Sequence, residues 1–233
     1  MATLTFYGGV KEIGGNKILL EDSGKRIWFD FGMSFGQASL YFAEFLQPKK
    51  FNGVIDYLKT KLLPSLDDMC GFYRGDYLAH CDMKVEEKPS YDAVFLSHAH
   101  ADHSSYIHFI RHDIPIYASK ITKQILYAIE VTSGTGLTDY TNYTETFQIK
   151  PKQKGDGYTR VRGEAARSPR NFTAFEESAG SVKFGDIGVE AIPVNHSLPG
   201  ACGYIIHTSR GAIVYTGDLR FHGYGGKLTQ KFV

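Results

Sequence analysis

The sequence contains little cysteine and no long apolar run, and each shortage excludes a class of protein. Its three cysteines, Cys70, Cys81 and Cys202, are odd in number and include no Cys-x-x-Cys pair. This usage argues against a disulfide framework and favours a reducing compartment, so we expect a cytoplasmic protein. The longest apolar runs, at residues 93–96 and 203–206, are far too short to span a bilayer, so we expect no membrane segment.

A secretory leader and a strong net charge are also missing. The N-terminus has neither a basic leader nor an apolar stretch that ends in a small-residue cleavage site, so we expect no signal peptide. The formal net charge of +1 does not decide for or against a nucleic-acid partner, because such a partner needs only a local basic face.

A local basic excess does occur between residues 150 and 170, where seven basic residues stand against two acidic ones. On charge alone, a solvated loop and a surface that faces a nucleic acid are equally good interpretations. The basic residues are Lys150, Lys152, Lys154, Arg160, Arg162, Arg167 and Arg170.

Short β-rich runs separated by glycine occur near both ends of the chain. Three runs, at 4–7, 17–20 and 26–31, predict an antiparallel meander. Two later segments, 181–194 and 204–215, each contain two apolar runs around a glycine-containing turn and predict two hairpins. The length of 233 residues indicates a single domain over residues 1–233.

The middle of the chain alternates helical and buried-strand patterns. Mixed helical spacing at 38–58 predicts one or two helices, and apolar runs at 93–96 and 114–118 predict buried strands. Residues 134–178 are rich in Thr, Gly, Lys and Arg, which predicts irregular surface with one strand near 147–149.

Ser119 is expected to cap a helix, with an apolar face formed by Ile121, Ile125, Ala128 and Ile129. Strands on both sides of a helical middle predict an α/β (α+β) fold, in which two sheets pack face to face with helices outside.

A dense group of potential metal ligands follows the first buried strand. His98, His100, Asp102 and His103 lie within six residues. Imidazole and carboxylate are ligands of zinc and similar ions, and a loop that leaves a rigid strand can fold several of them round an ion. A solvated polar turn is the alternative, but the strand before the group and the helix after it favour a metal site.

Three further polar residues, Asp30, His196 and Asp218, each follow or end an apolar strand. Each alone would be an ordinary surface residue. Their shared position predicts that they converge with the histidine group at one edge of the sheets.

The pattern His-x-His-x-Asp-His, with a later His and a later Gly-Asp, resembles the metallo-β-lactamase superfamily and its αββα sandwich. The resemblance covers nearly the whole chain and implies two Zn²⁺ sites, with Mn²⁺ as the alternative metal. It implies that His98, His100 and His196 hold one ion and that Asp102 and His103 hold the second. Asp218 would bridge the two ions, and Asp30 would support the ligand loop.

Within that superfamily, the sequence is similar to the β-CASP nucleases, which include ribonuclease J and related archaeal exonucleases. The matching segments are Gly8-Gly9, Glu12 to Gly14 with Asn16, Phe29 to Gly32, His196 to Ala201 and Val214 to Gly223. This similarity implies a ribonuclease that cleaves phosphodiester bonds with a metal-activated hydroxide.

The β-CASP cassette and the family's last metal-ligand histidine have no match within the 233 residues. The sandwich is therefore expected to be incomplete at its C-terminal end and its second metal weakly held, so that this chain alone is metal-poor and nearly inactive. A completing segment, a partner chain and a homodimer all fit this expectation.

Asp102 is expected to accept a proton from the nucleophile as well as to bind metal. His222 is a candidate general acid because it is near Asp218, and a supporting or surface role is the alternative. Two other functions remain open. One is a small-molecule hydrolase of the same fold, acting on thioesters, lactones or phosphodiesters, and the other is a catalytically incomplete fragment that binds RNA.

Overall fold

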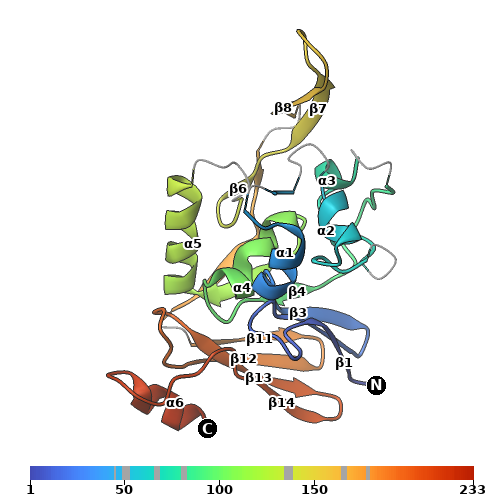
Figure 1. Ribbon diagram of the computed structural model, residues 1–233. Coiled ribbons are helices and arrows are strands. Elements are labelled where there is room, and N and C mark those ends of the chain that lie inside the picture. The colour runs from blue at the N-terminus through green and yellow to red at the C-terminus, as the bar shows by residue number, and fades with distance from the viewer. Residues whose placement is uncertain are drawn as a thin grey trace.

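The computed structural model contains two β-sheets that face each other, with most of the helices covering the outer side of the larger sheet (Figure 1). This confirms the predicted α+β arrangement of facing sheets with outer helices. The structure describes residues 1–44, 46–48, 53–65, 69–79, 83–133, 139–163, 167–176 and 179–233.

The larger sheet has six strands in the order β1-β2-β3-β4-β5-β10. The first three strands are antiparallel, as the predicted meander requires. Strands β3, β4, β5 and β10 are parallel, so their carboxyl ends lie at one edge of the sheet. The strands are β1 (Thr3–Gly8), β2 (Lys17–Asp22), β3 (Lys25–Phe31), β4 (Ala93–Phe95), β5 (Ile116–Ser119) and β10 (Phe172–Phe175).

The smaller sheet contains the two predicted hairpins, which pair side by side in the order β11-β12-β13-β14. Both β12 and β14 are antiparallel to β13. They therefore run in the same direction, and their carboxyl ends lie at the same edge of this sheet. The strands are β11 (Gly180–Phe184), β12 (Ile187–Pro193), β13 (Cys202–Thr208) and β14 (Gly211–Tyr215).

Short helices surround the sheets, and the last of them lies against the smaller sheet (Figure 1). Two helices fall in or near the predicted helical region 38–58, whereas α3 was not expected. The helices are α1 (Phe35–Tyr41), α2 (Ile55–Lys59), α3 (Gly75–Ala79), α4 (Ala101–Ser104), the 3₁₀ helix η1 (Ser105–Phe109), α5 (Lys120–Thr132) and α6 (Gly226–Phe232). None of the helices in the described parts of the chain could cross a membrane.

Helix α5 begins as predicted but buries a different face. The Ser119 hydroxyl accepts a hydrogen bond from the Thr122 backbone N–H at 3.0 Å, which confirms the cap. The Thr122 hydroxyl donates to the Gly200 carbonyl, so this side of the helix faces inward together with Leu126. The predicted apolar face is wrong for three of its four members, because the structure leaves exposed Ile121, Ala128 and Ile129.

The region 134–178 contains more strands than the single one expected near 147–149. That strand is present as β7, and β10 joins the main sheet by pairing with β5. The other strands form two separate two-stranded sheets. They are β6 (Tyr143–Thr144) with β9 (Ser168–Pro169), and β7 (Phe147–Pro151) with β8 (Tyr158–Arg162).

Two apolar clusters hold the layers together. Phe29 and Phe95 lie between the sheets and pack against Tyr204 of β13. On the opposite face of the larger sheet, Trp28 packs under the helical layer against Phe72. Alternate residues of one strand thus serve both clusters, and the strand ends that carry the polar groups are held rigidly.

Of the cysteines, Cys70 and Cys202 are free thiols, and Cys81 lies outside the described residues. His80 also lies outside them.

Candidate metal centre

The ligand candidates meet where strands of both sheets end. His98 follows β4, His196 follows β12, and Asp218 follows β14. The backbone N–H of Cys202 in β13 donates to the Ser97 carbonyl at 2.9 Å, which fixes the two sheet edges side by side. Convergence therefore follows from the strand directions and from this contact between the sheets.

Four of the predicted residues form one compact group, His98, His100, His196 and Asp218. One ligand atom from each lies within 4.8 Å of all the others. Nε2 of His98 is 2.9 Å from Nδ1 of His100, and Nε2 of His196 is 3.2 Å from the same atom. Ring nitrogens that face one another at this spacing, beside a carboxylate, could hold a single metal ion.

Asp102, His103 and Asp218 lie beside this first group. Nε2 of His103 is 3.7 Å from an Asp102 carboxylate oxygen and 3.5 Å from Oδ1 of Asp218. The other Asp218 oxygen, Oδ2, is 3.5 Å from Nε2 of His196. Asp218 thus has one oxygen toward each group.

Asp30 is fully buried beneath His103 and organises the region around it. Its carboxylate accepts from the Ser97 backbone N–H and hydroxyl at 2.7 Å each, and from the Tyr215 hydroxyl. His103 Nδ1 lies 2.6 Å from Oδ2 of Asp30. Because the carboxylate accepts the Nδ1 proton, Nε2 of His103 faces Asp102 and Asp218.

Burial and charge set opposite protonation preferences for neighbouring histidines. Burial, with the nearby His103 charge, lowers the pKa of His98 to about 3, so this ring is neutral. Burial would also lower the pKa of His103, but the Asp30 and Asp218 carboxylates outweigh it and raise the pKa to about 10. The His103 hydrogen bond lowers the pKa of Asp218 to about 2 despite partial burial. A cation bound at Nε2 of His103 would therefore have to replace a proton, and the ionised Asp218 carboxylate beside it favours that exchange.

Two glycines allow the ligand loop to sit close to the N-terminal meander. A Cβ on Gly32 would lie 1.9 Å from the Asp102 backbone, and one on Gly14, at φ +72°, would lie 2.2 Å from the Asp102 carboxylate. The Asp102 carbonyl accepts from the backbone N–H groups of Gly15 and Asn16 at 3.0 and 3.2 Å. Glycine is required at Gly32 and Gly14 because the loop leaves no room for a side chain.

The loops that carry His196 and Asp218 are fastened to each other and to α5. The Asn195 side-chain amide donates to the carbonyls of Arg220 and His222, at 3.2 and 2.8 Å. After His196, the Gly200 carbonyl accepts from the Ser119 hydroxyl at 2.6 Å. These bonds fix the positions of the loops that carry His196 and Asp218.

The donor set fits the metals that the sequence predicts. Three imidazoles and one carboxylate match a zinc site, and a neighbouring imidazole with two carboxylates also suits manganese. Asp218 is partly exposed, at 43%, whereas His98 and His103 are buried. The centre is therefore closed toward the core and open on the Asp218 side.

His222 lies outside this group. Its ring is exposed, and within the described chain it makes no hydrogen bond or ion pair with a cluster residue. Its backbone carbonyl instead accepts from Asn195. The structure thus gives His222 a place in the loop but gives its imidazole no contact with the centre.

The residues predicted to contact nucleic acid lie in different environments in the structure. Lys150, Lys152 and Lys154 are exposed, and Arg167 is an exposed partner of Glu145. The guanidinium of Arg160 lies 3.8 Å above the Phe147 ring. The Arg162 side chain is outside the described part of the structure.

Arg170 corrects the sequence interpretation. It is buried, and its guanidinium donates to the carbonyls of Ile107 and Ile110 at the end of η1. Burial lowers its pKa to about 9. The residue fixes the segment after β9 to the helical layer and does not face solvent.

Three residues for which we predicted no role lie around Asp30 in the structure: Ser97, Asn16 and Tyr215. Ser97 Oγ also lies 2.9 Å from Nδ1 of His98, and Asn16 Nδ2 donates to the Tyr215 hydroxyl at 3.2 Å. Ser97 directly precedes His98, and Tyr215 lies three residues before Asp218. A buried carboxylate needs hydrogen-bond donors, so polar residues next to predicted ligands could have been recognised as such donors.

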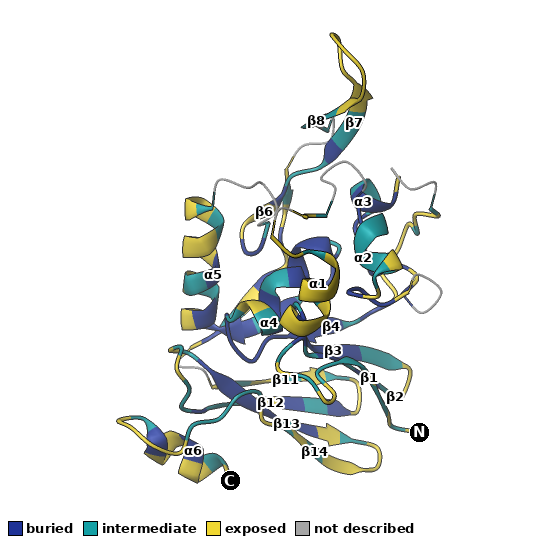
Figure 2. Ribbon diagram, viewed as in Figure 1, coloured by how far each residue is buried: buried dark blue, intermediate teal, exposed yellow. Residues whose placement is uncertain are grey.

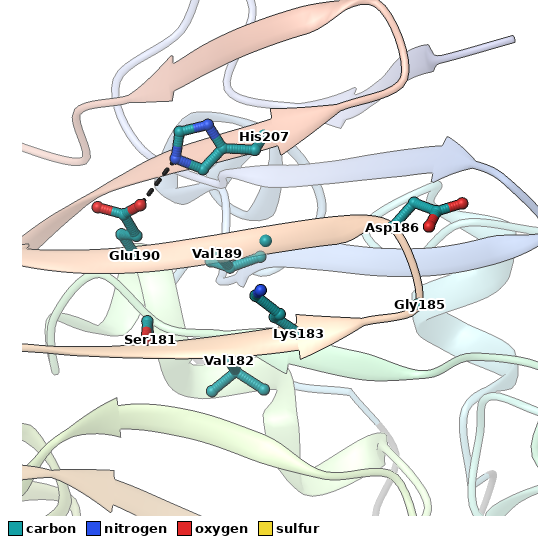
Figure 3. Close-up of a pocket in the computed structure, with 9 residues that line it drawn as sticks. Ser181, Val182, Lys183, Gly185, Asp186, Val189, Glu190 and His207 are labelled. Carbon is teal, nitrogen blue, oxygen red and sulfur yellow. Dashed lines mark hydrogen bonds and ion pairs between the residues drawn. The ribbon is translucent and has the colours of Figure 1, made fainter.

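A separate hollow of about 520 Å³ lies on the smaller sheet, at the opposite end of β12 from His196 (Figure 3). His207 points toward Glu190 across the neighbouring strands, with Nε2 2.8 Å from the carboxylate. Lys183 and Asp186 line the same hollow. No group of three or more potential metal ligands occurs there among the described residues.

Comparisons with known proteins agree with this geometry. A family model described as the beta-lactamase superfamily domain matches residues 64–231. Ribonuclease J of Mycolicibacterium smegmatis is 26% identical over 220 residues, covering 93% of this chain and 28% of that protein. Ribonuclease J 2 of Staphylococcus saprophyticus is 27% identical over 146 residues, covering 60% of this chain and 20% of that protein.

A crystal structure of a protein of unknown function from Enterococcus faecalis is similar with a TM-score of 0.68 and 28% identity. The similarity covers 99% of this chain and 46% of that one. The chain spans about a quarter of the length of the curated relatives that it matches. Because the family model covers well over half of the residues and the facing sheets agree with it, the chain belongs to the metallo-β-lactamase superfamily, with ribonuclease J among its distant relatives.

Proposed function

We propose that the protein is a metal-dependent phosphodiesterase that hydrolyses RNA in the cytoplasm. The observation that carries the proposal is the position of Asp218, with one carboxylate oxygen toward His196 and the other toward His103. A carboxylate shared in this way suits two neighbouring ions. The similarity to proteins named ribonuclease J supports RNA as the substrate.

The first ion would be held by the compact group of His98, His100, His196 and Asp218, and the second by Asp102, His103 and Asp218. Two such ions supply Lewis acidity for the attack of water on a phosphorus centre. Zn²⁺ is the first choice because of the three imidazoles, and Mn²⁺ is the alternative. Among the described residues the second group offers three donors, so we infer that the second ion binds more weakly than the first.

The chain's own residues would orient the site and move protons. Asp30 holds the His103 ring through Nδ1, so that Nε2 points at the centre. The carboxylate of Asp102 is partly accessible, at 15%, and is the nearest acceptor for a proton released by the nucleophile. A single strand of RNA could reach the centre from the exposed side, where Asp218 lies.

The test is cleavage of end-labelled single-stranded RNA by the purified protein, with Zn²⁺ or Mn²⁺ added after treatment with EDTA. We expect slow cleavage that needs metal, because the second ion is weakly held, and that is lost in Asp218→Ala and His196→Ala. His207→Ala is the matched control, because this histidine lies in the separate hollow (Figure 3). Metal-dependent hydrolysis of a thioester or lactone, without any cut in RNA, would contradict the proposal and support a small-molecule hydrolase.

A further inference from the structure

The hairpin of β7 and β8, residues 147–162, projects from the helical layer away from the sheets (Figure 1). We call it the arm. Within the described chain its two strands pair only with each other, and residues 150–158 are exposed along their whole length (Figure 2). An isolated two-stranded hairpin buries little and is marginally stable, so its projection needs an explanation other than packing.

The arm is strongly basic. Between residues 147 and 162 it has five basic residues and one acidic residue. Lys150, Lys152 and Lys154 are exposed, and in the described structure none of them has an ion-pair partner. Tyr158 is 59% exposed and pairs with Pro151, so its ring lies on the face of the ribbon opposite to Lys150 and Lys152. Unpaired ammonium groups on one face and an exposed aromatic ring on the other suit a phosphodiester backbone whose unpaired bases fold round the ribbon.

The base of the arm is firmly attached. Phe147 is buried and packs edge-on against Tyr77, with ring centroids 4.9 Å apart. The buried Arg74 donates to the Glu145 carbonyl at 2.7 Å and to the Asp139 carboxylate at 2.6 Å. These contacts fix the direction of the arm although its tip is free. A rigid base lowers the entropy that binding would have to offset.

The arm and the metal centre lie toward opposite edges of the larger sheet. The chain returns from the arm through β9 into the amino end of β10, where the Asn171 carbonyl accepts from Ile116 N–H at 2.8 Å. His98 follows the carboxyl end of β4, which runs parallel to β5 and β10. The arm therefore does not contribute to the centre itself.

We propose that the arm binds the phosphate backbone of a single-stranded nucleic acid at a distance from the metal centre. The lysines contact phosphates, and Tyr158 stacks on a base. If the strand is the substrate of the proposed hydrolase, the arm holds a remote part of it, and to this extent the inference rests on the proposed function. Binding by the arm needs no metal. The tip, residues 152–157, is Lys-Gln-Lys-Gly-Asp-Gly and has no apolar side chain to insert into a membrane.

The experiment measures the anisotropy of a labelled 20-nucleotide RNA in EDTA, over a series of salt concentrations. The arm variant is Lys150→Gln, Lys152→Gln and Lys154→Gln together. The matched control carries the same charge change at three exposed lysines elsewhere, Lys183→Gln, Lys227→Gln and Lys231→Gln. Circular dichroism and thermal melting check that both variants are folded.

We expect the arm variant to lose about two units of slope in a plot of log affinity against log salt, since each single-strand phosphate contact contributes roughly 0.7. The affinity difference between the wild type and the arm variant should therefore grow about a hundredfold for each tenfold fall in salt concentration. Tyr158→Leu should weaken binding about tenfold with an unchanged slope. The control should bind like the wild type.

Equal losses in the arm and control variants would overturn the inference, because binding would then follow net charge alone. So would loss of binding to anionic phospholipid vesicles in the arm variant with RNA binding unchanged. Failure of the proposed function looks different: RNA would still bind through the arm in EDTA, but no metal would produce cleavage.

Discussion

The metal centre and the arm use charged side chains in opposite ways. At the centre, Asp30 and His103 are buried, and each has several partners drawn from both sheets. On the arm, the side chains of Lys152 and Lys154 are exposed and form no hydrogen bond or ion pair with any described residue. A residue of the centre therefore affects stability as well as ligand binding, whereas a residue of the arm tip is free to act on a ligand alone.

The largest effect that this contrast predicts is a loss of stability in the variant Asp30→Ala. The substitution leaves the buried His103 without its counter-ion and Ser97 without its acceptor, so we expect a loss of about 3–5 kcal/mol in the free energy of unfolding. Urea denaturation measures it. Asp156→Ala on the exposed arm tip is the control and should stay within about 0.5 kcal/mol of the wild type. Similar values for the two variants would remove the contrast.

The next effect is on metal affinity. His196→Ala removes one donor of the compact group, so we expect zinc to bind at least about a hundredfold more weakly, or about 2.7 kcal/mol. Titration calorimetry of the EDTA-treated protein measures this. His207→Ala, in the hollow of Figure 3, should leave the zinc affinity unchanged, because its ring pairs with Glu190. A loss in both variants would mean that zinc binds to surface histidines in general.

A smaller effect concerns a lysine that is buried, unlike those of the arm. Lys17 is 2% exposed, and burial lowers its pKa from 10.5 to about 8 despite the nearby Glu12. Between these pH values the unfolded chain holds a proton that the folded chain does not. The native state therefore becomes more stable with rising pH, by about 1.4 kcal/mol for each pH unit at most.

This contribution is absent in Lys17→Met. The stability of the wild type relative to the variant should be constant below pH 8 and should then rise up to about pH 10, as measured by urea denaturation at each pH. Other titrating groups are common to both proteins and cancel in the difference. A constant difference from pH 7 to pH 10 would show that the ammonium of Lys17 is solvated.

The smallest effect is that of the arm variant on stability. Substituting the three exposed lysines of the arm by glutamine should change the free energy of unfolding by no more than about 0.5 kcal/mol for each substitution. Thermal melting and urea denaturation measure it without RNA. A larger loss would mean that the lysines stabilise the hairpin. Any loss of RNA binding in the variant would then be attributed to unfolding of the hairpin.

The convergence of the predicted ligand residues could be foreseen from the sequence because each of them is marked locally. His98 to His103 form one short motif, and His196 and Asp218 each follow an apolar strand. Strand direction then brings them together, and the meander and hairpins were predicted from glycine-separated apolar runs. These are features of short segments, which can be recognised without knowing their partners.

What the sequence did not predict depends on contacts between distant segments. Arg170 appears in the sequence as one of seven basic residues, and only its position under Ile107 and Ile110 shows that it is structural. The inward face of α5 is set by the bond from Thr122 to Gly200, which is 78 residues away. Strand β10 has only four residues and is defined by its pairing with β5.

The hydrogen bond from Tyr215 to Asp30 joins residues 185 positions apart. During synthesis, the N-terminal meander therefore leaves the ribosome long before the last donor to its buried carboxylate exists. Until β14 has been made, the Asp30 carboxylate lacks the Tyr215 hydroxyl as a donor. Such late, long-range closure slows folding and lengthens the period in which chaperones or aggregation compete for the nascent chain.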